Sequence, residues 1–518
     1  MLSKVYSASI LGVEASIVEV EVDMSNGLPV FHMTGYLGAR VREAEDRVKT
    51  AVKNVNHPIP SSHIVINVSP ASIRKSGTML DLPIAVGILA DMEIIRKSAL
   101  EEFLIVGELS LDGKVNPIPG VLAMVHEAKK RGIKKAIVPV RNLMETELME
   151  DMMIVGAGNL AEVIDVMNDD DALPVGCPRS SEGLSGNEPD FCEVKGQEMA
   201  KQAILIAACG RHNLLMSGPP GTGKTLLASR IPSILPRLTN EEMIEISKIY
   251  SICGLLDHSS VIRKRPFRAP HHTISDVAML GGGAFPVPGE ITLAHRGVLF
   301  LDELTLFRPF TLESMRQPLE EGEIKVIRNG ISVNFPSDLM LVAAMNPCKC
   351  GYYPDRSRCR CTDYDIKRHI GHLSKPFLDR FDLMVHVDKP KYQELVWEDV
   401  EEAEACKELR ILKDPYSSKS MQKVVERVVA IQKERYRKEE FSYNKDLPAK
   451  ALETYCVLDG EGRALLKRAY EKYSLSARGY NKIIKVARTI ADMEGEEYIR
   501  APHVSEAIIL RNLEESEM

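Results

Sequence analysis

Residues 214–228 read LLMSGPPGTGKTLLA, and this segment is the most informative one in the chain. Its centre, residues 218–225, matches the phosphate-binding pattern G-x-x-x-x-G-K-[ST] in full. An apolar run precedes the match, as a buried strand would, and another follows it, as the start of a helix would. Glycines let a backbone wrap closely around a phosphate, so that N–H groups and the helix N-terminus face the anion. A chance glycine-rich turn is the alternative, but it would not need the flanking strand and helix patterns.

The side chains of this loop have distinct expected tasks. Lys224 should reach the β- and γ-phosphates of a nucleotide, and the Thr225 hydroxyl should bind Mg²⁺. We therefore expect ATP and Mg²⁺ as cofactors. The residues expected to surround the phosphates are Gly218, Pro219, Pro220, Gly221, Thr222, Gly223, Lys224 and Thr225.

A second apolar run, GVLFLDE at residues 297–303, ends in two acids. A fully buried parallel strand has this pattern, and ligands bind beyond the C-terminal ends of such strands. We expect Asp302 to hold Mg²⁺ through water and Glu303 to polarise the attacking water as a general base. Taken alone, the run fits an ordinary strand followed by a solvated acidic turn. Its pairing with the phosphate loop favours the catalytic interpretation.

Length and composition place bounds on the whole chain. Its 518 residues predict about two to four domains, and 44% hydrophobic and 27% charged residues are typical of a soluble globular protein. Because the sequence has no run of about 18 apolar residues and no signal-peptide pattern at its start, we expect no membrane partner and a cytoplasmic location. The formal net charge of −7 argues against a globally basic nucleic-acid binder but leaves room for a locally basic groove or pore.

The pattern along the chain predicts a multidomain α/β protein. Near the start, SNGLP at 25–29 indicates a hairpin between strands at 17–22 and 30–33, and a further strand is expected at 103–109. The expected segments are an α+β or α/β domain, a Pro/Gly/Ser-rich linker, a nucleotide-binding core and a charged helical region, at 1–170, 171–190, 191–388 and 389–518.

Two polar positions follow apolar runs in the core. Asn346 follows a strand pattern at 340–345, where a polar side chain can sense the γ-phosphate or orient water; an asparagine in a turn before Pro347 fits equally well locally. Arg380 lies within FLDRFDL at 377–383 and suits an arginine finger, which stabilises transition-state charge in a neighbouring subunit's site. A structural Arg–Asp pair is the alternative.

Four of the ten cysteines are clustered, at Cys348, Cys350, Cys359 and Cys361. Cysteines of a cytosolic chain are not expected to form disulfides. Four thiolates on one short loop suit tetrahedral Zn²⁺, which would supply the folding energy of a loop that has no apolar core. Reduced, unligated or redox-sensitive thiols are the alternative.

Taken in order, these motifs resemble those of the ComM/YifB family of magnesium-chelatase-like AAA+ ATPases. The resemblance implies an AAA+ core with a helical lid, a first sensor at Asn346, a finger at Arg380, a second sensor at Arg478 and a ring, expected to be a homo-hexamer. Besides the phosphate loop it covers RAPHHT (268–273), PGEITLAHRGVLFLDE (288–303), AAMNPCKCGYY (343–353), LDRFDL (378–383) and LSARGYNKIIKVARTIADM (475–493).

Insertions in the core suggest which polymer such a motor would bind. EIKVIRNGISV at 323–333 alternates around Asn-Gly and predicts a β-hairpin. In related helicase-type AAA+ proteins such a hairpin enters the central pore, so Lys325 and Arg328, expected near its tip, could contact DNA phosphates. A Gly/Pro-rich insert at 281–295 is a second candidate pore loop. Solvated hairpins are the alternative, and the basic stretch RKRPFR at 263–268 either serves the same purpose or forms a solvated face.

The N-terminal segment resembles the proteolytic domain of Lon at 75–83 and 107–132, which implies an S5-like α+β fold. Lon-type proteolysis needs a serine activated by a lysine. Asp81 stands at the serine position and Leu122 at the lysine position. We therefore expect a proteolytically inactive domain that serves either assembly or DNA binding.

The resemblance implies an ATP-driven ring motor acting on DNA, a helicase or branch-migration factor in recombination or natural transformation. One alternative is a chelatase motor that remodels a partner protein for Mg²⁺ insertion into a tetrapyrrole, although a Lon-like domain is outside that family pattern. The other is a peptidase, which Asp81 and Leu122 disfavour.

Overall fold

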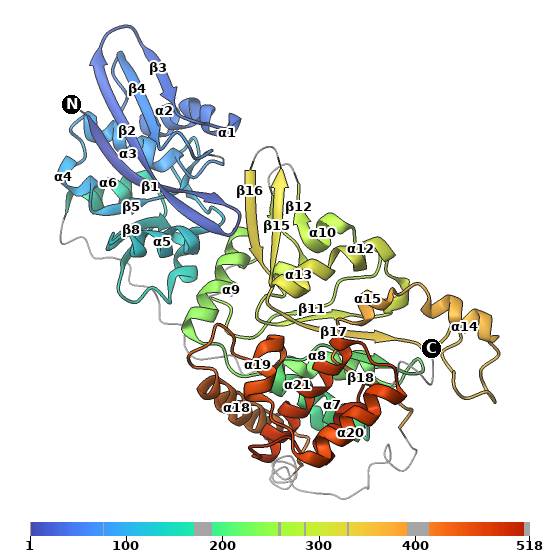
Figure 1. Cartoon of the computed structure of the whole chain (residues 1–518). Coiled ribbons are helices and arrows are strands. Elements are labelled where there is room, and N and C mark those ends of the chain that lie inside the picture. The colour runs from blue at the N-terminus through green and yellow to red at the C-terminus, as the bar shows by residue number, and fades with distance from the viewer. Residues whose placement is uncertain are drawn as a thin grey trace, which may run out of the picture.

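The computed structural model describes most of the chain. The first third of the sequence forms one large sheet and the middle forms another, and the C-terminal region is helical (Figure 1). The expected linker and the start of the expected helical region lie largely outside the described residues. The structure describes residues 2–75, 77–169, 189–256, 261–283, 286–328, 331–390 and 414–511.

The N-terminal sheet has seven strands in the order β3-β4-β2-β1-β5-β8-β9. Helix α3 is buried along most of its length and packs on β1 and β2, so its apolar sequence closes one face of the sheet. The strands are β1 (Ser3–Leu11), β2 (Glu14–Asn26), β3 (Val30–Thr34), β4 (Ser62–Ser69), β5 (Phe103–Ile105), β8 (Lys135–Pro139) and β9 (Met153–Ala157), with β6 (Glu108–Leu109) paired to β7 (Val115–Asn116). The helices are α1 (Ala39–Arg42), α2 (Ala44–Asn54), α3 (Asp81–Asp91), α4 (Lys97–Leu100), α5 (Val121–Lys130) and α6 (Leu160–Asn168).

The expected hairpin of β2 with β3 is wrong, because β4 lies between them. β4 pairs antiparallel with β2 and parallel with β3, where Val30 is opposite His63. Side chains of β4 alternate between buried and half-buried, whereas β3 is half-buried or exposed throughout. The strand with a face for the core thus takes the inner place and β3 takes the edge. The strand expected at 103–109 is also interrupted, since the Gly107 N–H leaves the sheet to donate to the Met79 carbonyl.

The central sheet has five parallel strands in the order β11-β14-β17-β10-β18. β10, β14 and β17 are buried throughout, as their unbroken apolar runs predict. Because the strands run the same way, the residues that follow these three strands meet at one edge of the sheet. The strands are β10 (Leu214–Ser217), β11 (Phe267–Arg268), β14 (Val298–Leu301), β17 (Met340–Met345) and β18 (Leu383–His386).

Helices and two hairpins surround this sheet. The alternating sequence around Asn-Gly forms a hairpin as predicted, and Figure 1 shows it rising from the central sheet beside the N-terminal sheet. Val13, in the turn between β1 and β2, shares a buried cluster with Val333 of this hairpin. The hairpins are β12 (Gly281–Gly282) with β13 (Val287–Pro288) and β15 (Glu323–Arg328) with β16 (Ile331–Pro336). The helices are α7 (Glu198–Gly210), α8 (Lys224–Ile234), α9 (Asn240–Ile252), α10 (Asp276–Leu280), α11 (Glu290–Leu293), α12 (Pro309–Ser314), α13 (Arg316–Glu321), α14 (Asp363–Ile370) and α15 (Lys375–Leu378).

The C-terminal region is helical, and it packs on the central sheet through α7 and α8. A buried polar network joins its helices: Asp492 accepts hydrogen bonds from Arg435 Nη1 and Asn444 Nδ2, both at 2.9 Å, and Asn444 Oδ1 accepts one from the Tyr436 hydroxyl at 2.6 Å. These buried polar groups are therefore paired. The helices are α18 (Ser418–Arg435), α19 (Ala449–Tyr455), α20 (Gly460–Lys472), α21 (Ala477–Glu494) and α22 (Ala501–Ile509).

Within the described residues, every helix is either too short or too polar to cross a membrane.

Candidate functional site

The phosphate loop joins the buried strand β10 to helix α8. Gly223 has a φ of +88°, in the left-handed region that glycine adopts without strain, and α8 begins at the next residue, Lys224. The loop backbone and the N-terminus of α8 thus lie at the strand's C-terminal end. This is the strand–loop–helix arrangement that the motif predicts.

Lys224 folds back over its own loop. Its Nζ donates to the carbonyl oxygens of Gly218 and Pro219, both at 2.8 Å, and to Asn346 Oδ1 at 3.3 Å. Burial lowers the pKa of Lys224 to about 8, although the nearby Asp302 carboxylate opposes the shift. A phosphate at this position would restore the anionic surroundings that favour the protonated amine.

The two acids after β14 take different positions. Asp302 Oδ2 accepts a hydrogen bond from Thr225 Oγ1 at 2.6 Å, so the two expected Mg²⁺ ligands lie side by side. Glu303 has a φ of +51°, and its side chain is 55% exposed. Its Oε2 lies 3.7 Å from His272 Nδ1. The sequence motifs do not single out His272 as a site residue, although RAPHHT begins at the last residue of β11, which runs parallel to β14 and ends at the same edge of the sheet as Glu303.

A cavity of about 610 Å³ opens over these residues. It is lined by the phosphate loop and the first turns of α8, together with Asp302, Glu303 and Asn346. The ends of three neighbouring strands therefore converge on one space. It offers a lysine, a hydroxyl, two carboxylates and an amide, a set that can hold a Mg²⁺–polyphosphate and a water molecule.

Arg380 and Arg478 are not among the described residues that line this cavity. The Arg380 carbonyl accepts a hydrogen bond from Asn213 Nδ2 at 2.9 Å; Asn213 precedes β10, whereas the phosphate loop follows it. A strand of four residues spans about 13 Å, so the two features lie at opposite ends of β10. Arg380 Nη2 instead contacts Glu320 Oε1 at 2.6 Å, and Arg478 Nη2 is 3.9 Å from the same oxygen. The structure brings the two arginines together, but not to the phosphate loop of their own chain.

The four clustered cysteines come together in space. The Sγ atom of Cys348 is 3.4 Å from that of Cys350 and 3.7 Å from that of Cys359, and the four Sγ atoms, with that of Cys361, lie within 4.8 Å of one another. A tetrahedral Zn²⁺ with Zn–S bonds of about 2.3 Å would hold its sulfurs about 3.8 Å apart. Burial disfavours thiolates here, yet hydrogen bonds from the Tyr352 N–H and the neighbouring thiols lower the pKa of Cys350 to about 6. The cluster has the composition and spacing of a metal site.

The cysteine loop contacts the nucleotide site directly. A Cβ added to Gly351 would lie 2.5 Å from Pro220 Cδ of the phosphate loop. In α14, which follows the cysteine loop, His369 Nε2 is 3.2 Å from the Asn346 carbonyl oxygen and 3.3 Å from Thr305 Oγ1. No local pattern distinguishes His369 in the sequence, because its neighbours come from other segments.

The candidate DNA contacts on the β15–β16 hairpin are both exposed but differ in place. Arg328 is opposite Ile331 at the tip, as expected. Lys325 is lower, opposite Asn334, and lines a small cavity with Glu14 of the N-terminal sheet. The expectation that Lys325 lies near the tip is therefore wrong.

The arginines of the basic stretch at 263–268 make contacts within the chain, although Arg263 and Lys264 are exposed to solvent. Arg265 is buried and donates to two backbone carbonyls, while Arg268 makes two hydrogen bonds of 2.7 Å with Glu290. Arg263 Nη2 is 2.8 Å from Glu147. These arginines hold elements together, which weakens their interpretation as DNA contacts.

The two positions expected to correspond to a protease dyad have other surroundings. Asp81 is buried and accepts two hydrogen bonds from Arg47, at 2.7 and 2.9 Å. Burial raises the pKa of Asp81, although the hydrogen bonds from Arg47 oppose the shift. Leu122 is fully buried in α5. A carboxylate clamped by arginine and a core leucine cannot act as a serine–lysine pair.

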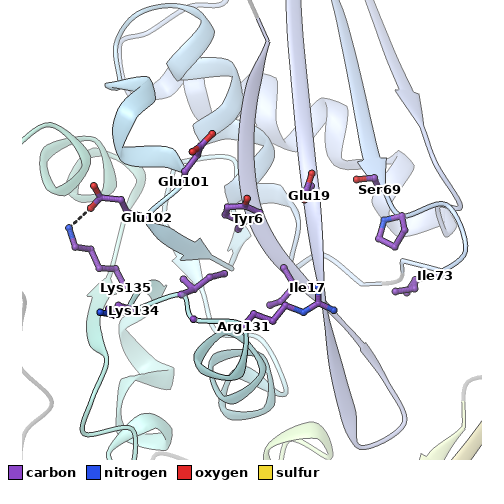
Figure 2. Close-up of a pocket in the computed structure, with 13 residues that line it drawn as sticks. Tyr6, Ile17, Glu19, Ser69, Ile73, Glu101, Glu102, Arg131, Lys134 and Lys135 are labelled. Carbon is purple, nitrogen blue, oxygen red and sulfur yellow. Dashed lines mark hydrogen bonds and ion pairs between the residues drawn. The ribbon is translucent and has the colours of Figure 1, made fainter.

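A second cavity, of about 750 Å³, lies against the N-terminal sheet (Figure 2). Glu101 and Glu102 lie on one side of it and Arg131 and Lys134 nearer the other, and Lys135 forms an ion pair with Glu102 at its rim. None of the residues singled out as catalytic lines it. Its charges are mixed, and size alone does not make it the active site.

Comparisons with known proteins agree with this geometry. Residues 190–395 match the family described as magnesium chelatase, subunit ChlI; residues 20–142 match subunit ChlI of Mg-chelatase; and residues 415–511 match its C-terminal family. The chain is 40% identical over 512 residues to competence protein ComM of Haemophilus influenzae, covering 98% of this chain and 97% of that protein. It is 39% identical over 514 residues to YifB of Escherichia coli, covering 99% and 97%.

A more distant relative shares only part of the chain. The magnesium-chelatase 38 kDa subunit of Rhodobacter capsulatus is 25% identical over 219 residues, which cover 39% of this chain and 56% of that protein. The match to ComM and YifB, by contrast, runs through both sheets and the C-terminal helices. A parallel-sheet core with a phosphate loop, a C-terminal helical region and full-length similarity at this level together show that the chain belongs to the ComM/YifB family of magnesium-chelatase-like AAA+ ATPases.

Proposed function

We propose that this protein is an ATP-driven ring motor that acts on DNA. The observation that carries the proposal is the division of its catalytic groups. The phosphate loop lies at one end of β10, while Arg380 and Arg478 lie together near the other end. A phosphate loop on one chain and two arginines on the next form a complete site only between neighbouring subunits, as in a closed ring, which we infer to be a hexamer.

Within that site each residue has a chemical task. Lys224 would neutralise the β- and γ-phosphates, and Thr225 and Asp302 would hold Mg²⁺, which would offset the phosphate charge. Glu303 accepts a proton from the attacking water, which the Asn346 amide orients. Arg380 and Arg478 of the neighbour stabilise the negative charge that develops on the transferred phosphoryl group.

DNA is the proposed polymer for two reasons. The β15–β16 hairpin presents Arg328 and the 65% exposed Ile327 at its projecting end, a combination suited to a phosphate backbone and to bases. The chain also matches a competence protein over nearly its whole length. We therefore infer a helicase or branch-migration activity that serves recombination or natural transformation.

Zn²⁺ is the proposed occupant of the cysteine cluster. Four sulfurs within 4.8 Å of one another match the ligand set of a closed structural site. The metal would tie Cys348 and Cys350, which follow the first sensor, to Cys359 and Cys361, which precede α14. Its proposed role is to hold this loop against the phosphate loop.

The N-terminal part, which we assign to residues 1–170, is proposed to be a non-proteolytic domain of the Lon type. Asp81 and Leu122, in place of a serine and a lysine, support the non-proteolytic assignment. The domain is also attached to the core through α9, where Lys248 Nζ is 3.2 Å from Glu14. We assign a linker to 171–190, the AAA+ core to 191–388 and a helical lid to 389–518. A domain tied to the core in this way suits an assembly or DNA-binding platform.

A chelatase-type motor that remodels a partner protein is the second candidate. It is favoured by the match of 25% over 219 residues to a magnesium-chelatase subunit. DNA dependence separates the two candidates, because a protein-remodelling motor has no reason to hydrolyse ATP faster on DNA.

The decisive experiment measures ATP turnover and strand displacement on forked and four-way-junction DNA, with Lys224→Ala as the inactive control. We expect DNA to stimulate turnover, salt to weaken that stimulation, and the variant to be inert. Wild-type protein that stays monomeric with ATP and DNA, or that hydrolyses ATP at the same rate without DNA, would overturn the proposal.

A further inference from the structure

Glu320 is a carboxylate shared by the two arginines that the chain would present to its neighbour. Its Oε1 is 2.6 Å from Arg380 Nη2 and 3.9 Å from Arg478 Nη2. Arg380 is only 8% exposed, and its Nε is buried without a hydrogen-bond partner among the described residues. A side chain held in this way does not project toward a neighbour. Glu320 therefore keeps Arg380 drawn against its own chain.

The helix that carries Glu320 is bonded to both ends of the β15–β16 hairpin. Glu320 lies in α13, and β15 begins two residues after that helix ends. At the other end of the hairpin, the buried Ser337 donates its backbone N–H to the Gly322 carbonyl at 2.7 Å and its hydroxyl to the Pro318 carbonyl at 3.0 Å. A displacement of the hairpin must therefore move α13, because these bonds close the base of the hairpin onto the helix.

The two arginines are held by other elements, namely the central sheet and helix α21. Arg380 lies two residues after α15, and its carbonyl is bonded to Asn213 at the start of β10. Arg478 lies in the first turn of α21, and Lys482 of the same helix donates to the Phe381 carbonyl and pairs with Asp382, both at 3.0 Å. The two arginines are thus fixed to each other through the sheet and α21. Glu320 contacts both arginines directly from the hairpin's helix. A second link runs through Glu313 of α12, which accepts hydrogen bonds from Arg316 of α13 and from Ser374 at the start of α15.

We propose that Glu320 is a positioning residue that couples the β15–β16 hairpin to the neighbouring subunit's ATP site. Without DNA, Glu320 holds the buried Arg380 back, beside Arg478, whose side chain is 61% exposed. When DNA displaces the hairpin, α13 carries Glu320 away and Arg380 becomes free to join Arg478 at the phosphates bound by the next chain. This inference rests on the proposed function, because it assumes a DNA-binding hairpin and arginines that act between subunits.

The test compares Glu320→Gln with Glu321→Gln in the full chain. Glu321 is the next residue of the same helix, and its carboxylate accepts hydrogen bonds from Gln317 at 2.9 and 3.1 Å rather than from an arginine. Both variants lose one negative charge from α13, but only Glu320→Gln weakens the ionic hold on the arginines. Turnover is measured with and without forked DNA, together with KM for ATP and the mass of the ring.

We expect Glu320→Gln to raise the DNA-independent kcat about fivefold or more, with KM for ATP nearly unchanged, so that stimulation by DNA falls toward one. Glu321→Gln should keep the wild-type ratio. If Glu320→Gln assembles poorly, Glu320→Asp, which keeps the charge but is too short for the 2.6 Å contact, should show the same loss of stimulation.

Wild-type stimulation in both Glu320 variants would overturn the coupling while leaving the ring motor intact. Wild-type protein that DNA does not stimulate at all would instead overturn the proposed function, and the coupling with it. A lower DNA-independent kcat in Glu320→Gln, with DNA stimulation retained, would show that Glu320 orients the arginines rather than holding them back, and would also contradict the proposal.

Discussion

Glu303 is the side chain that we propose as the general base for ATP hydrolysis. We expect Glu303→Gln to bind ATP about as tightly as the wild type, because the phosphate-binding groups are untouched, and to lower kcat by about 10²- to 10⁴-fold, since a general base is lost. Fluorescent-nucleotide binding and steady-state turnover check the two halves separately. Unchanged turnover would remove Glu303 from the role of base.

Asp382 is a single buried side chain that we expect to contribute to the stability of the fold. Although burial alone would raise the pKa of Asp382, Lys482, His212 and the Asn213 N–H hold it well below its ordinary value. Because the folded pKa is lowered, the stabilisation is fully present above the unfolded pKa of about 4 and is lost as the pH falls below it. We expect Asp382→Asn to cost about 3 kcal/mol at pH 7, the loss of one partner of a buried ion pair.

Urea denaturation at pH 7.5 and at lower pH measures this cost. The difference between wild type and Asp382→Asn should shrink as the pH falls below about 4. Asp388→Asn is the matched control, since the Asp388 side chain is 86% exposed. Equal midpoints for the two variants at pH 7.5 would contradict the expected role of Asp382.

At the scale of elements, the cysteine loop and the phosphate loop are in contact at one glycine. Gly351 has a φ of +83°, and a Cβ there would lie 2.5 Å from Pro220 Cδ. Gly132 has a similar φ of +85°, but a Cβ there would meet nothing within 4 Å. Both glycine-to-alanine changes strain the backbone, but only Gly351→Ala must displace the phosphate loop.

We therefore expect Gly351→Ala to weaken ATP binding about tenfold, equivalent to about 1.4 kcal/mol, while Gly132→Ala lowers Tm slightly and leaves the affinity unchanged. Nucleotide titration and thermal unfolding of both variants provide the comparison. The same ATP affinity in both would mean that the contact does not position the phosphate loop.

Metal binding is the second property that we propose for the cysteine loop. Elemental analysis should find about one Zn²⁺ per chain, and the double variant Cys359→Ser/Cys361→Ser should lose it, because hydroxyls replace two of four thiolate ligands. Besides the cysteines, the small core of this loop holds two α14 isoleucines and the half-buried Tyr352 and Tyr353, so metal loss should increase its susceptibility to proteases. Metal-free wild-type protein with an intact, protease-resistant loop would end the zinc assignment.

For the whole molecule, the division of the catalytic groups predicts complementation between chains. Arg380→Ala should lower kcat by about 10³- to 10⁵-fold, as loss of an arginine finger does. In mixed rings, however, an Arg380→Ala chain supplies an intact phosphate loop and Glu303, and a Glu303→Gln neighbour supplies the arginine. Random mixing of two inactive variants should therefore restore about a quarter of the wild-type rate.

The mixing is checked by native mass analysis of rings that carry differently tagged chains. Arg380→Ala mixed with Lys224→Ala should show the same recovery, because the Lys224→Ala chain also retains its arginines. Mixed rings that stay as inactive as either parent would place Arg380 outside the neighbour's site.

Sequence patterns were sufficient to predict the parts whose chemistry is local. Eight consecutive residues specify the phosphate loop, because its backbone N–H groups, lysine and hydroxyl all belong to one strand–loop–helix step. Asp302, Glu303 and Asn346 could be placed beside it, since buried parallel strands end at a common edge. The spacing of the four cysteines sufficed to bring them together on one loop.

Contacts between distant segments could be found only from the folded arrangement. It placed β4 between β2 and β3, His272 beside Glu303, and Glu320 between Arg380 and Arg478. It also separated the arginines from the phosphate loop of their own chain by the length of β10. Neither propensity nor spacing encodes such neighbours, because they depend on how sheets and helices share their buried faces across hundreds of residues.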